Sequence, residues 1–268
     1  MGKIKKDIIN VRGKFGDHSI VERRKQDPFI RKNVKAGSKK KEVALQKQYT
    51  RTSSLNVFAS SFKILMHSAY EPFPSSDLYQ KTLSRLRLAK SDSRIGLLYS
   101  LKGLEISREY PFDRFQKPKL NITELEKDLR ITLEIDIHPY NRKLWKCKTY
   151  YYEMMLLQWK DGSDQPTITR QATDWVNRKG PRPEFEIDFP LSKKTREWML
   201  VTGIFFGENN VLDERFPSMG IKITDVGSYH SDDKEWLENL KAEEVKAKKQ
   251  LNEGKGVELV RVKAKSMK

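Results

Sequence analysis

The clearest structural signal in the chain is residues 129–137, LRITLEIDI, in which apolar and polar residues alternate over nine positions. The apolar residues are Leu129, Ile131, Leu133, Ile135 and Ile137. Successive side chains of a β-strand point to opposite faces, so this alternation predicts a strand with one buried face and one face in water. Such a strand is typical of an antiparallel sheet that packs on a core on one side only.

Further strand candidates lie on both sides of this stretch. FEIDFPL, residues 185–191, repeats the alternation. The other candidates are RIGLLYSL (94–101), TYYYEMMLLQW (149–159), TITRQATDWV (167–176), REWMLVTGIFF (196–206) and MGIKITDV (219–226). Turn-forming segments such as KDGSD and RKGPRP separate them. Such a series without intervening helices predicts an antiparallel β-sandwich or open barrel over residues 94–230.

Helical patterns flank this β region. Residues 38–70 contain no Pro or Gly, and apolar residues recur there at helical spacing, at Leu55, Phe58, Phe62, Leu65 and Ala69. A second, shorter helix is expected at residues 77–90, within a helical segment covering residues 38–93. Residues 231–268 are expected to form a C-terminal helix, which opens with the capping pair Asp232 and Glu235, and a basic tail. VELVRV, residues 257–262, could form a short edge strand. The expected fold class is α+β.

The charge of the chain is concentrated at its N-terminus. The whole chain carries a net charge of +17, and residues 1–52 hold 16 Lys and Arg against 5 Asp and Glu, a net charge of +11. Residues 1–37 have few periodic apolar residues and are expected to form an extended basic arm that becomes ordered only against a partner. Within FIRKNVKAGSKKK, residues 29–41, six cations occur without an acid. A neutral body with a cationic arm concentrates its field where a polyanion could bind.

We therefore predict that this arm contacts nucleic acid electrostatically, without reading its sequence. The residues expected to supply the contacts are Arg12, Arg23, Arg24, Arg31, Lys32, Lys35, Lys39, Lys40 and Lys41. Two alternatives stay open for the same segment: a strap that docks on an acidic protein surface or takes part in self-assembly, and a tail that only keeps the protein in solution.

The residues that usually carry catalysis are sparse. The chain has four histidines, none paired at metal-ligand spacing, and no phosphate-binding glycine loop. The single cysteine, Cys147, excludes an internal disulfide, and no base is identified that would make it a nucleophile. The carboxylate pairs 134/136, 186/188 and 161/164 are interpreted as solvent faces of strands and as turn chemistry. The sequence predicts no enzyme: no catalytic residue, no metal site and no cofactor.

Aromatic residues gather in the β region, and three consecutive tyrosines, Tyr150 to Tyr152, must show both faces of a strand. Exposed rings could stack on bases or sugars, so a carbohydrate-binding β domain is a third functional alternative. The interpretation we favour is that these rings pack under loops or in a subunit interface.

The sequence contains no run of eighteen uncharged apolar residues and no apolar stretch of signal-peptide length near its start. We expect no membrane partner and a cytoplasmic location, with incorporation into a phage particle as a further destination.

The order of features in residues 10–70 resembles an uncharacterised family of basic proteins from Bacteroidota and their phages. The resemblance rests on the Gly-Lys-x-Gly stretch at residues 13–16, the basic segment with Ile30-Arg31, and the helix from Ala44-Leu45-Gln46 through Phe58 and Phe62. Asp17-His18 after the second glycine departs from the small or apolar residues expected there. The resemblance implies a non-enzymatic protein of a phage or mobile element, and it implies no catalytic residue.

Overall fold

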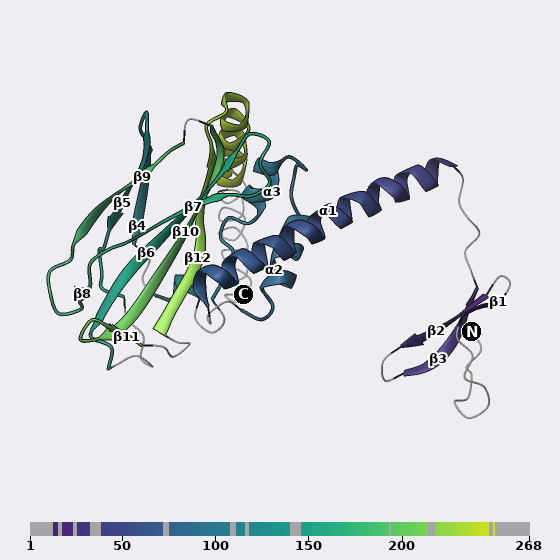
Figure 1. Cartoon of the computed structure of the whole chain (residues 1–268), viewed down its shortest axis with the longest axis horizontal. Helices are drawn as coiled ribbons and strands as arrows, with labels where there is room; N and C mark the ends of the chain where they lie inside the picture. Colours follow the sequence, from purple (N-terminus) through teal and green to yellow (C-terminus); the bar gives the residue numbers. More distant parts are fainter. Residues whose placement is uncertain are drawn as a thin grey trace, which may run out of the picture. The chain divides into compact units, whose positions relative to one another are not determined.

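The computed structural model describes residues 13–15, 18–23, 26–32, 39–71, 75–107, 111–115, 118–139, 146–192, 194–213, 218–246 and 249. The chain divides into two compact units, residues 1–56 and residues 57–268 (Figure 1). Helices and antiparallel sheets are both abundant, which confirms the α+β class.

The first unit contains a small antiparallel sheet where the sequence predicted an extended arm. Its strands are β1 (Gly13–Phe15), β2 (His18–Arg23) and β3 (Gln26–Lys32), and they pair in the order β1-β2-β3. The apolar residues of β2 and β3 come as adjacent pairs, Ile20-Val21 and Phe29-Ile30, and not at alternate positions. Such pairs do not produce the period-2 signal from which strands are recognised. The sheet is formed by backbone pairing between strands, and the order of apolar residues along each strand does not predict it.

Helix α1 (Lys39–Tyr70) follows the predicted helical segment closely. Its buried stripe is Leu55, Ala59, Phe62, Met66 and Tyr70. The predicted face shares only Leu55 and Phe62 with this stripe, because Phe58, Leu65 and Ala69 are half-buried at its margin. Steps of four, three, four and four residues keep a stripe on one side of a helix, so the predicted face was correct in period and displaced in position.

Two short helices come next, and one of them corrects the prediction. Helix α2 (Leu78–Arg87) lies within the expected range. RIGLLYSL, predicted as a strand, forms helix α3 (Arg94–Ser100) instead. The Ser93 hydroxyl accepts a hydrogen bond from the backbone N–H of Gly96 at 3.2 Å, which is an N-cap. This cap satisfies a backbone N–H of the first turn that has no partner within the helix. The apolar pattern of residues 94–101 is compatible with a strand or a helix, and the cap favours the helix. A 3-10 turn, η1 (Phe112–Arg114), follows.

The main sheet of the second unit is built around its longest strand, β10 (Thr195–Glu208). On one side β10 pairs antiparallel with β6 (Thr149–Lys160) along almost its whole length. On the other side it pairs with β12 (Met219–Ser228) and then with β11 (Val211–Leu212). The far edge of β6 carries β7 (Thr167–Ala172) and β8 (Val176–Asn177).

A second sheet contains the stretch that first indicated the fold. Its strands β4 (Lys119–Glu124), β5 (Asp128–Glu134) and β9 (Glu184–Pro190) pair antiparallel in that order. The apolar residues of β5 are buried, and its charged residues form the outer face, where Arg130 pairs with Asp188. The predicted alternation is thus confirmed within β5 and β9, but the strand ends at Glu134 and not at Ile137, and Ile137, which was predicted to lie on the buried face, is 54% exposed.

The two sheets pack face to face and enclose the hydrophobic core. Leu129, Ile131 and Leu133 of β5 and Phe189 of β9 share this core with alternate residues of the large sheet, which are Tyr150, Tyr152, Met154 and Leu156 of β6 and Trp198, Leu200, Ile204 and Phe206 of β10. The intervening residues of β6 and β10 face the opposite side of the large sheet. There the second half of α1 contacts the sheet, with the Tyr70 ring stacked on Phe205 at 6.3 Å. The unit is a β-sandwich with helices on its outer face (Figure 1).

A C-terminal helix, residues 231–246, packs on its own unit. Leu237 and Leu240 are buried, and the Trp236 ring lies edge-on to Tyr99 at 6.3 Å, just before the end of α3. Lys90 and Glu243 form an ion pair at 2.9 Å. Val245, near the end of the same helix, is 66% exposed. The expected strand at residues 257–262 lies outside the described residues.

Candidate nucleic-acid interface

The nine cations predicted to contact nucleic acid fall on several elements of the first unit. Six lie in regular structure: Arg23 at the end of β2, Arg31 and Lys32 at the end of β3, and Lys39, Lys40 and Lys41 in the first turn of α1. Outside the described residues lie Arg12, Arg24 and Lys35.

The antiparallel register separates the strand cations into two groups. Arg31 pairs with Ser19 and Lys32 with His18, whereas Arg23 pairs with Gln26 at the other end of the hairpin. Five residue steps along β3 correspond to about 16 Å between these ends. Lys14 of β1 lies beside Ser19, so positions 14, 19 and 31 form one row across the sheet. Lys14 was not among the predicted contacts, because only the strand pairing places it in the same row as Arg31, with Ser19 between them.

Three lysines open α1, at the end of a helix where the backbone dipole is positive. Cations are unfavourable at this end, and anions are favourable, because unpaired N–H groups point outward there. Lys39, Lys40 and Lys41 therefore add to a positive potential that the helix itself creates. A phosphate group would relieve this repulsion.

Several cations of the second unit form ion pairs with acids. These pairs include Lys102 with Asp225, Lys119 with Asp136, Arg130 with Asp188, Arg196 with Asp161 and Lys222 with Asp113. Hydrogen bonds from Arg130 lower the pKa of Asp188. Two carboxylate pairs of the sequence are thereby explained, since Arg130 also contacts Glu186 and Lys119 also contacts Glu134.

The other candidate reactive groups have structural surroundings. Both ring nitrogens of His138 have partners, the Tyr150 hydroxyl at 2.9 Å and the Gly180 carbonyl at 3.1 Å. Cys147 is 1% exposed, and its Sγ lies 3.2 Å from Asp213 Oδ2. His230 is exposed just before the C-terminal helix. Catalytic use of Cys147 would require a substrate to reach a buried sulfur, which disfavours that role.

Within the described residues, no three His, Cys, Asp or Glu side chains come together in a group that could hold a metal ion. No helix in the same part of the chain is long and apolar enough to span a membrane.

The three consecutive tyrosines divide between the two faces of β6, as predicted. Tyr150 and Tyr152 are fully buried in the sandwich core. Tyr151 points to the other face, where its ring stacks on Phe205 at 5.1 Å and meets Trp175 at 4.6 Å. Trp159 and Trp198 are also buried. These rings pack inside the protein, and they do not form an exposed platform on which a sugar could stack.

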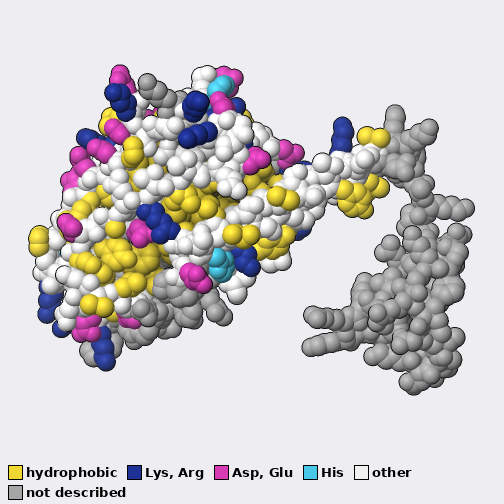
Figure 2. All heavy atoms as spheres, viewed as in Figure 1, with side chains coloured by type: hydrophobic (Ala, Val, Ile, Leu, Met, Phe, Trp, Pro, Cys, Tyr) yellow, Lys and Arg dark blue, Asp and Glu magenta, His cyan; other side chains and the backbone are white. Residues whose placement is uncertain are grey.

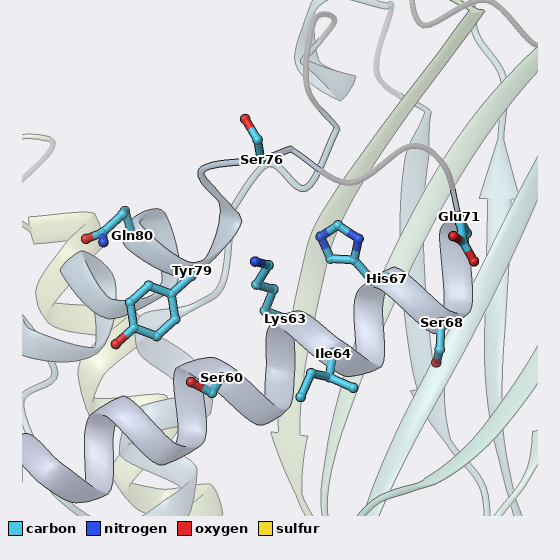
Figure 3. A pocket seen from close by; sticks show the side chains of 9 residues that line it. All are labelled: Ser60, Lys63, Ile64, His67, Ser68, Glu71, Ser76, Tyr79 and Gln80. Carbon is cyan, nitrogen blue, oxygen red and sulfur yellow. The ribbon is translucent and has the colours of Figure 1, made fainter.

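A hollow of about 770 Å³ lies between the outward side of α1 and the start of α2 (Figure 3). Ser60, Lys63, Ile64, His67, Ser68 and Glu71 of α1 and the turn after it line one side, and Ser76, Tyr79 and Gln80 line the other. Lys63 and His67 reach toward the segment that carries Ser76 (Figure 3). Sequence reasoning missed this hollow, because it depends on how two helices pack.

An ionisable cluster lies at the C-terminal end of α1, in which Glu153 is partly buried and Arg170 is exposed. Arg170 donates a hydrogen bond to the Ala69 carbonyl at 2.5 Å and lies 5.2 Å from the Tyr70 ring centroid. A cation there satisfies a terminal carbonyl of the helix and matches its dipole. Arg170 Nη1 is 4.0 Å from Glu153 Oε1, which has no hydrogen-bond partner among the described residues. Burial raises the pKa of Glu153, and Arg170 lowers it by a smaller amount.

We expect Glu153→Gln to raise the free energy of unfolding relative to the wild type as pH rises. A raised pKa in the folded state means that the wild type loses stability between the unfolded pKa, near 4.5, and the folded pKa. The glutamine does not titrate, so the difference between the two proteins should grow over this window and then stay constant. Urea denaturation at pH 4 and at pH 7.5 measures it. The exposed Glu126→Gln controls for loss of one carboxylate, and a difference that shrinks with rising pH would show that the pair with Arg170 dominates.

Comparison of the chain with protein families, with curated proteins and with solved structures finds no match. The functional proposal below therefore rests on the residues and the geometry described above.

Proposed function

We propose that this chain is a non-enzymatic structural or assembly protein whose cationic N-terminal segment contacts nucleic acid through phosphates, without sequence specificity. The observation that carries the proposal is the division of charge between the two units. Residues 1–56 have a net charge of +11, whereas residues 57–268, almost four times as long, have a net charge of +6. An assembly role in a phage or mobile-element particle is part of the proposal and is supported by the resemblance of residues 10–70.

The surface of the second unit supports assigning the contact to the first. Basic and acidic side chains alternate over the visible face of the body (Figure 2). Many of its cations already lie in ion pairs, as with Lys222, whose Nζ is 2.6 Å from Asp113 Oδ2. A cation held by a carboxylate gains less from a phosphate, because the first interaction must be given up.

The distribution of the N-terminal cations favours phosphate contact over base reading. They come from β2, from β3, from the first turn of α1 and from the stretches between. Base reading requires side chains presented together on one helix or ribbon in a groove. Neutralising phosphates requires only mobile cations at roughly correct spacing.

Binding to DNA and RNA oligomers over a salt series tests the proposal. We expect the logarithm of the association constant to fall linearly with the logarithm of salt concentration, with a slope of about −0.9 per phosphate contact on duplex DNA and about −0.7 on single strands. Oligomers of equal length and different sequence should bind alike. A flat salt dependence, or a strong preference for one sequence, would contradict phosphate-only contact.

A protein–protein assembly role is the second candidate, and one observation favours it. Apolar side chains are exposed along helix α1 (Figure 2). Among them are Tyr49, which is 71% exposed, and Ile64, which is 69% exposed. Nucleic-acid contact and assembly are compatible, since they use different residues.

A further inference from the structure

The hollow between α1 and α2 holds two basic side chains that form no ion pair within the described residues. Lys63 and His67 lie one turn apart on α1, so their side chains reach the same region of the hollow (Figure 3). Each follows a buried residue of the helix by one position, Phe62 and Met66. The two basic residues therefore stand at the margin of the buried face of α1, where a ligand can reach them.

The His67 ring carries a nitrogen that lacks a hydrogen bond. Its Nε2 atom is buried and has no hydrogen-bond partner in the part of the chain that the structure describes. One ring nitrogen faces the side of the hollow where Lys63 and Ser76 lie (Figure 3). A buried polar atom without a partner is uncommon in proteins and costs free energy. This nitrogen therefore points to a group that comes from outside the chain.

The opposite wall of the hollow is fixed by contacts with the body of the second unit. The Ser75 N–H donates to the Ile106 carbonyl at 3.0 Å, and Ser75 and Leu78 are both buried. These contacts hold Ser76 and Tyr79, which line the hollow, in place before a ligand binds. A preformed wall lowers the entropy that binding costs.

Two acidic side chains lie near the hollow, and neither neutralises Lys63. Asp77 is not among the lining residues, and its carboxylate forms an ion pair with Lys81 at 3.1 Å. Glu71 does line the hollow, one turn beyond His67 and on the other side of the ring from Lys63 (Figure 3). It is exposed, so water and salt screen its charge. The region between α1 and Ser76 therefore favours an anion.

The size and the lining of the hollow indicate an organic anion. Its volume of about 770 Å³ is in the range of small-molecule sites and is larger than a phosphate ion alone needs. The hydroxyls of Ser60 and Ser76 can donate to phosphate oxygens, as the Lys63 ammonium can. Ile64 and the ring of Tyr79 supply apolar surface beside these donors. An aromatic ring of this kind can stack on a nucleobase.

We propose that this hollow binds a phosphate monoester linked to an aromatic base, as in a nucleoside monophosphate. Lys63 and His67 hold the phosphate, and the base lies against Ile64 and Tyr79. The site lies wholly within the second unit, so it does not rest on contact between nucleic acid and the first unit. A free nucleotide and the phosphorylated end of a strand carry the same chemistry, and both are sources of such a group.

Calorimetric titration of the intact, nuclease-treated protein with AMP tests the site. We expect one saturable site per chain with a dissociation constant below about 1 mM. Lys63→Met and His67→Phe keep the size of each side chain, and each should weaken binding by about tenfold or more, because a hydrogen bond to a charged group is lost. Lys241→Met removes an exposed lysine outside the hollow and should leave the dissociation constant unchanged. Circular dichroism shows whether each variant keeps its fold. No saturable binding of AMP, or equal weakening by all three variants, would overturn the proposal.

Fragments of the ligand locate the phosphate and the base. Inorganic phosphate should compete with AMP, and adenosine should bind at least about tenfold more weakly than AMP, because it lacks the anion. Tyr79→Ala should weaken AMP by about tenfold, through loss of stacking, and leave the affinity for inorganic phosphate unchanged. Adenosine that binds as tightly as AMP, or an equal loss of affinity for AMP and for phosphate in Tyr79→Ala, would overturn the assignment.

A phosphorylated oligomer distinguishes the two sources of the phosphate monoester. Displacement of bound AMP by a 5′-phosphorylated deoxyadenosine hexamer would support the end of a strand as the ligand, and AMP that stays bound would support a free nucleotide. Binding of the hexamer to the first unit does not displace AMP from the hollow, so failure of the site and failure of the proposed nucleic-acid contact are distinguishable. A hexamer without the 5′ phosphate that displaces AMP equally well would show that the monoester is not recognised, and would overturn the proposal.

Discussion

Replacing the nine N-terminal cations with glutamine should remove most of the affinity for nucleic acid. The variant changes Arg12, Arg23, Arg24, Arg31, Lys32, Lys35, Lys39, Lys40 and Lys41. Each phosphate contact contributes about 0.9 to the log–log salt slope on duplex DNA, so the slope should fall by up to about 8 units. Near physiological salt, a loss on this scale corresponds to at least about 1,000-fold weaker binding. Fluorescence anisotropy over a salt series measures both quantities.

A matched variant of the body separates this effect from a simple change in net charge. It replaces nine exposed cations of the second unit: Arg85, Arg87, Lys127, Lys148, Lys179, Arg182, Lys194, Lys241 and Lys246. Both variants lose nine positive charges, but only the first should lose most of the slope. Equal losses would mean that the whole surface acts as a diffuse cation, and a loss confined to the body variant would place the interface on the second unit.

Two smaller variants show which elements of the first unit take part. One replaces Arg23, Arg31 and Lys32 of the small sheet, and the other replaces Lys39, Lys40 and Lys41 of α1. If all six contact phosphates at once, each variant should lower the slope by about 2.7 units on duplex DNA. The register places Arg23 at the opposite end of the hairpin from Arg31 and Lys32, so a loss nearer 1.8 units for the sheet variant would mean that only one end makes contact.

Phe189→Ala should lower the free energy of unfolding by about 3–5 kcal/mol, the range for a large aromatic residue removed from a core. Phe189 is fully buried and pairs with Leu129 across the smaller sheet. It joins the core shared by the two sheets, so its removal leaves a cavity between them. Urea denaturation followed by tryptophan fluorescence measures the change.

Phe185 provides the control on the same strand. It has the same orientation in β9 as Phe189, because it lies four residues earlier, but it is only partly buried at the margin of the core. Phe185→Ala should therefore cost clearly less than Phe189→Ala. Equal costs, or a cost below about 1 kcal/mol at Phe189, would contradict the packing of the smaller sheet on the larger one.

The sandwich was readable from sequence because its strands are half-buried. The strands in LRITLEIDI and FEIDFPL have one face in the core and one face in water. Apolar and polar residues therefore alternate along them. The strands β6 and β10 are covered on both faces, and they were recognised by long apolar runs between turns. Their pairing order was not predictable, since every apolar run is compatible with many partners.

Two local predictions were wrong, one for residues 94–101 and one for the N-terminal segment. RIGLLYSL is apolar enough for a buried strand, but it forms a helix whose first turn is capped by the Ser93 side chain. The N-terminal segment reads as loop, yet β1, β2 and β3 form a small antiparallel sheet held by backbone pairing. In both cases hydrogen bonds outside the hydrophobic pattern determined the result.

For the candidate interface, charge was predictable and position was not. The cluster of Lys and Arg in residues 1–52 is visible in the printed sequence, whereas the row containing Lys14 and Arg31 exists only through strand register.

Sequence by itself determined the fold class, the helix of residues 39–70, the alternating strands and the separation of charge, because these follow from local spacing and composition. Tertiary structure alone decided the pairing of β6, β10 and β12, the burial of Cys147 and Tyr152, and which face of α1 meets the sheet. These depend on contacts between residues far apart in the chain. Many arrangements satisfy the same local pattern, and only packing selects among them.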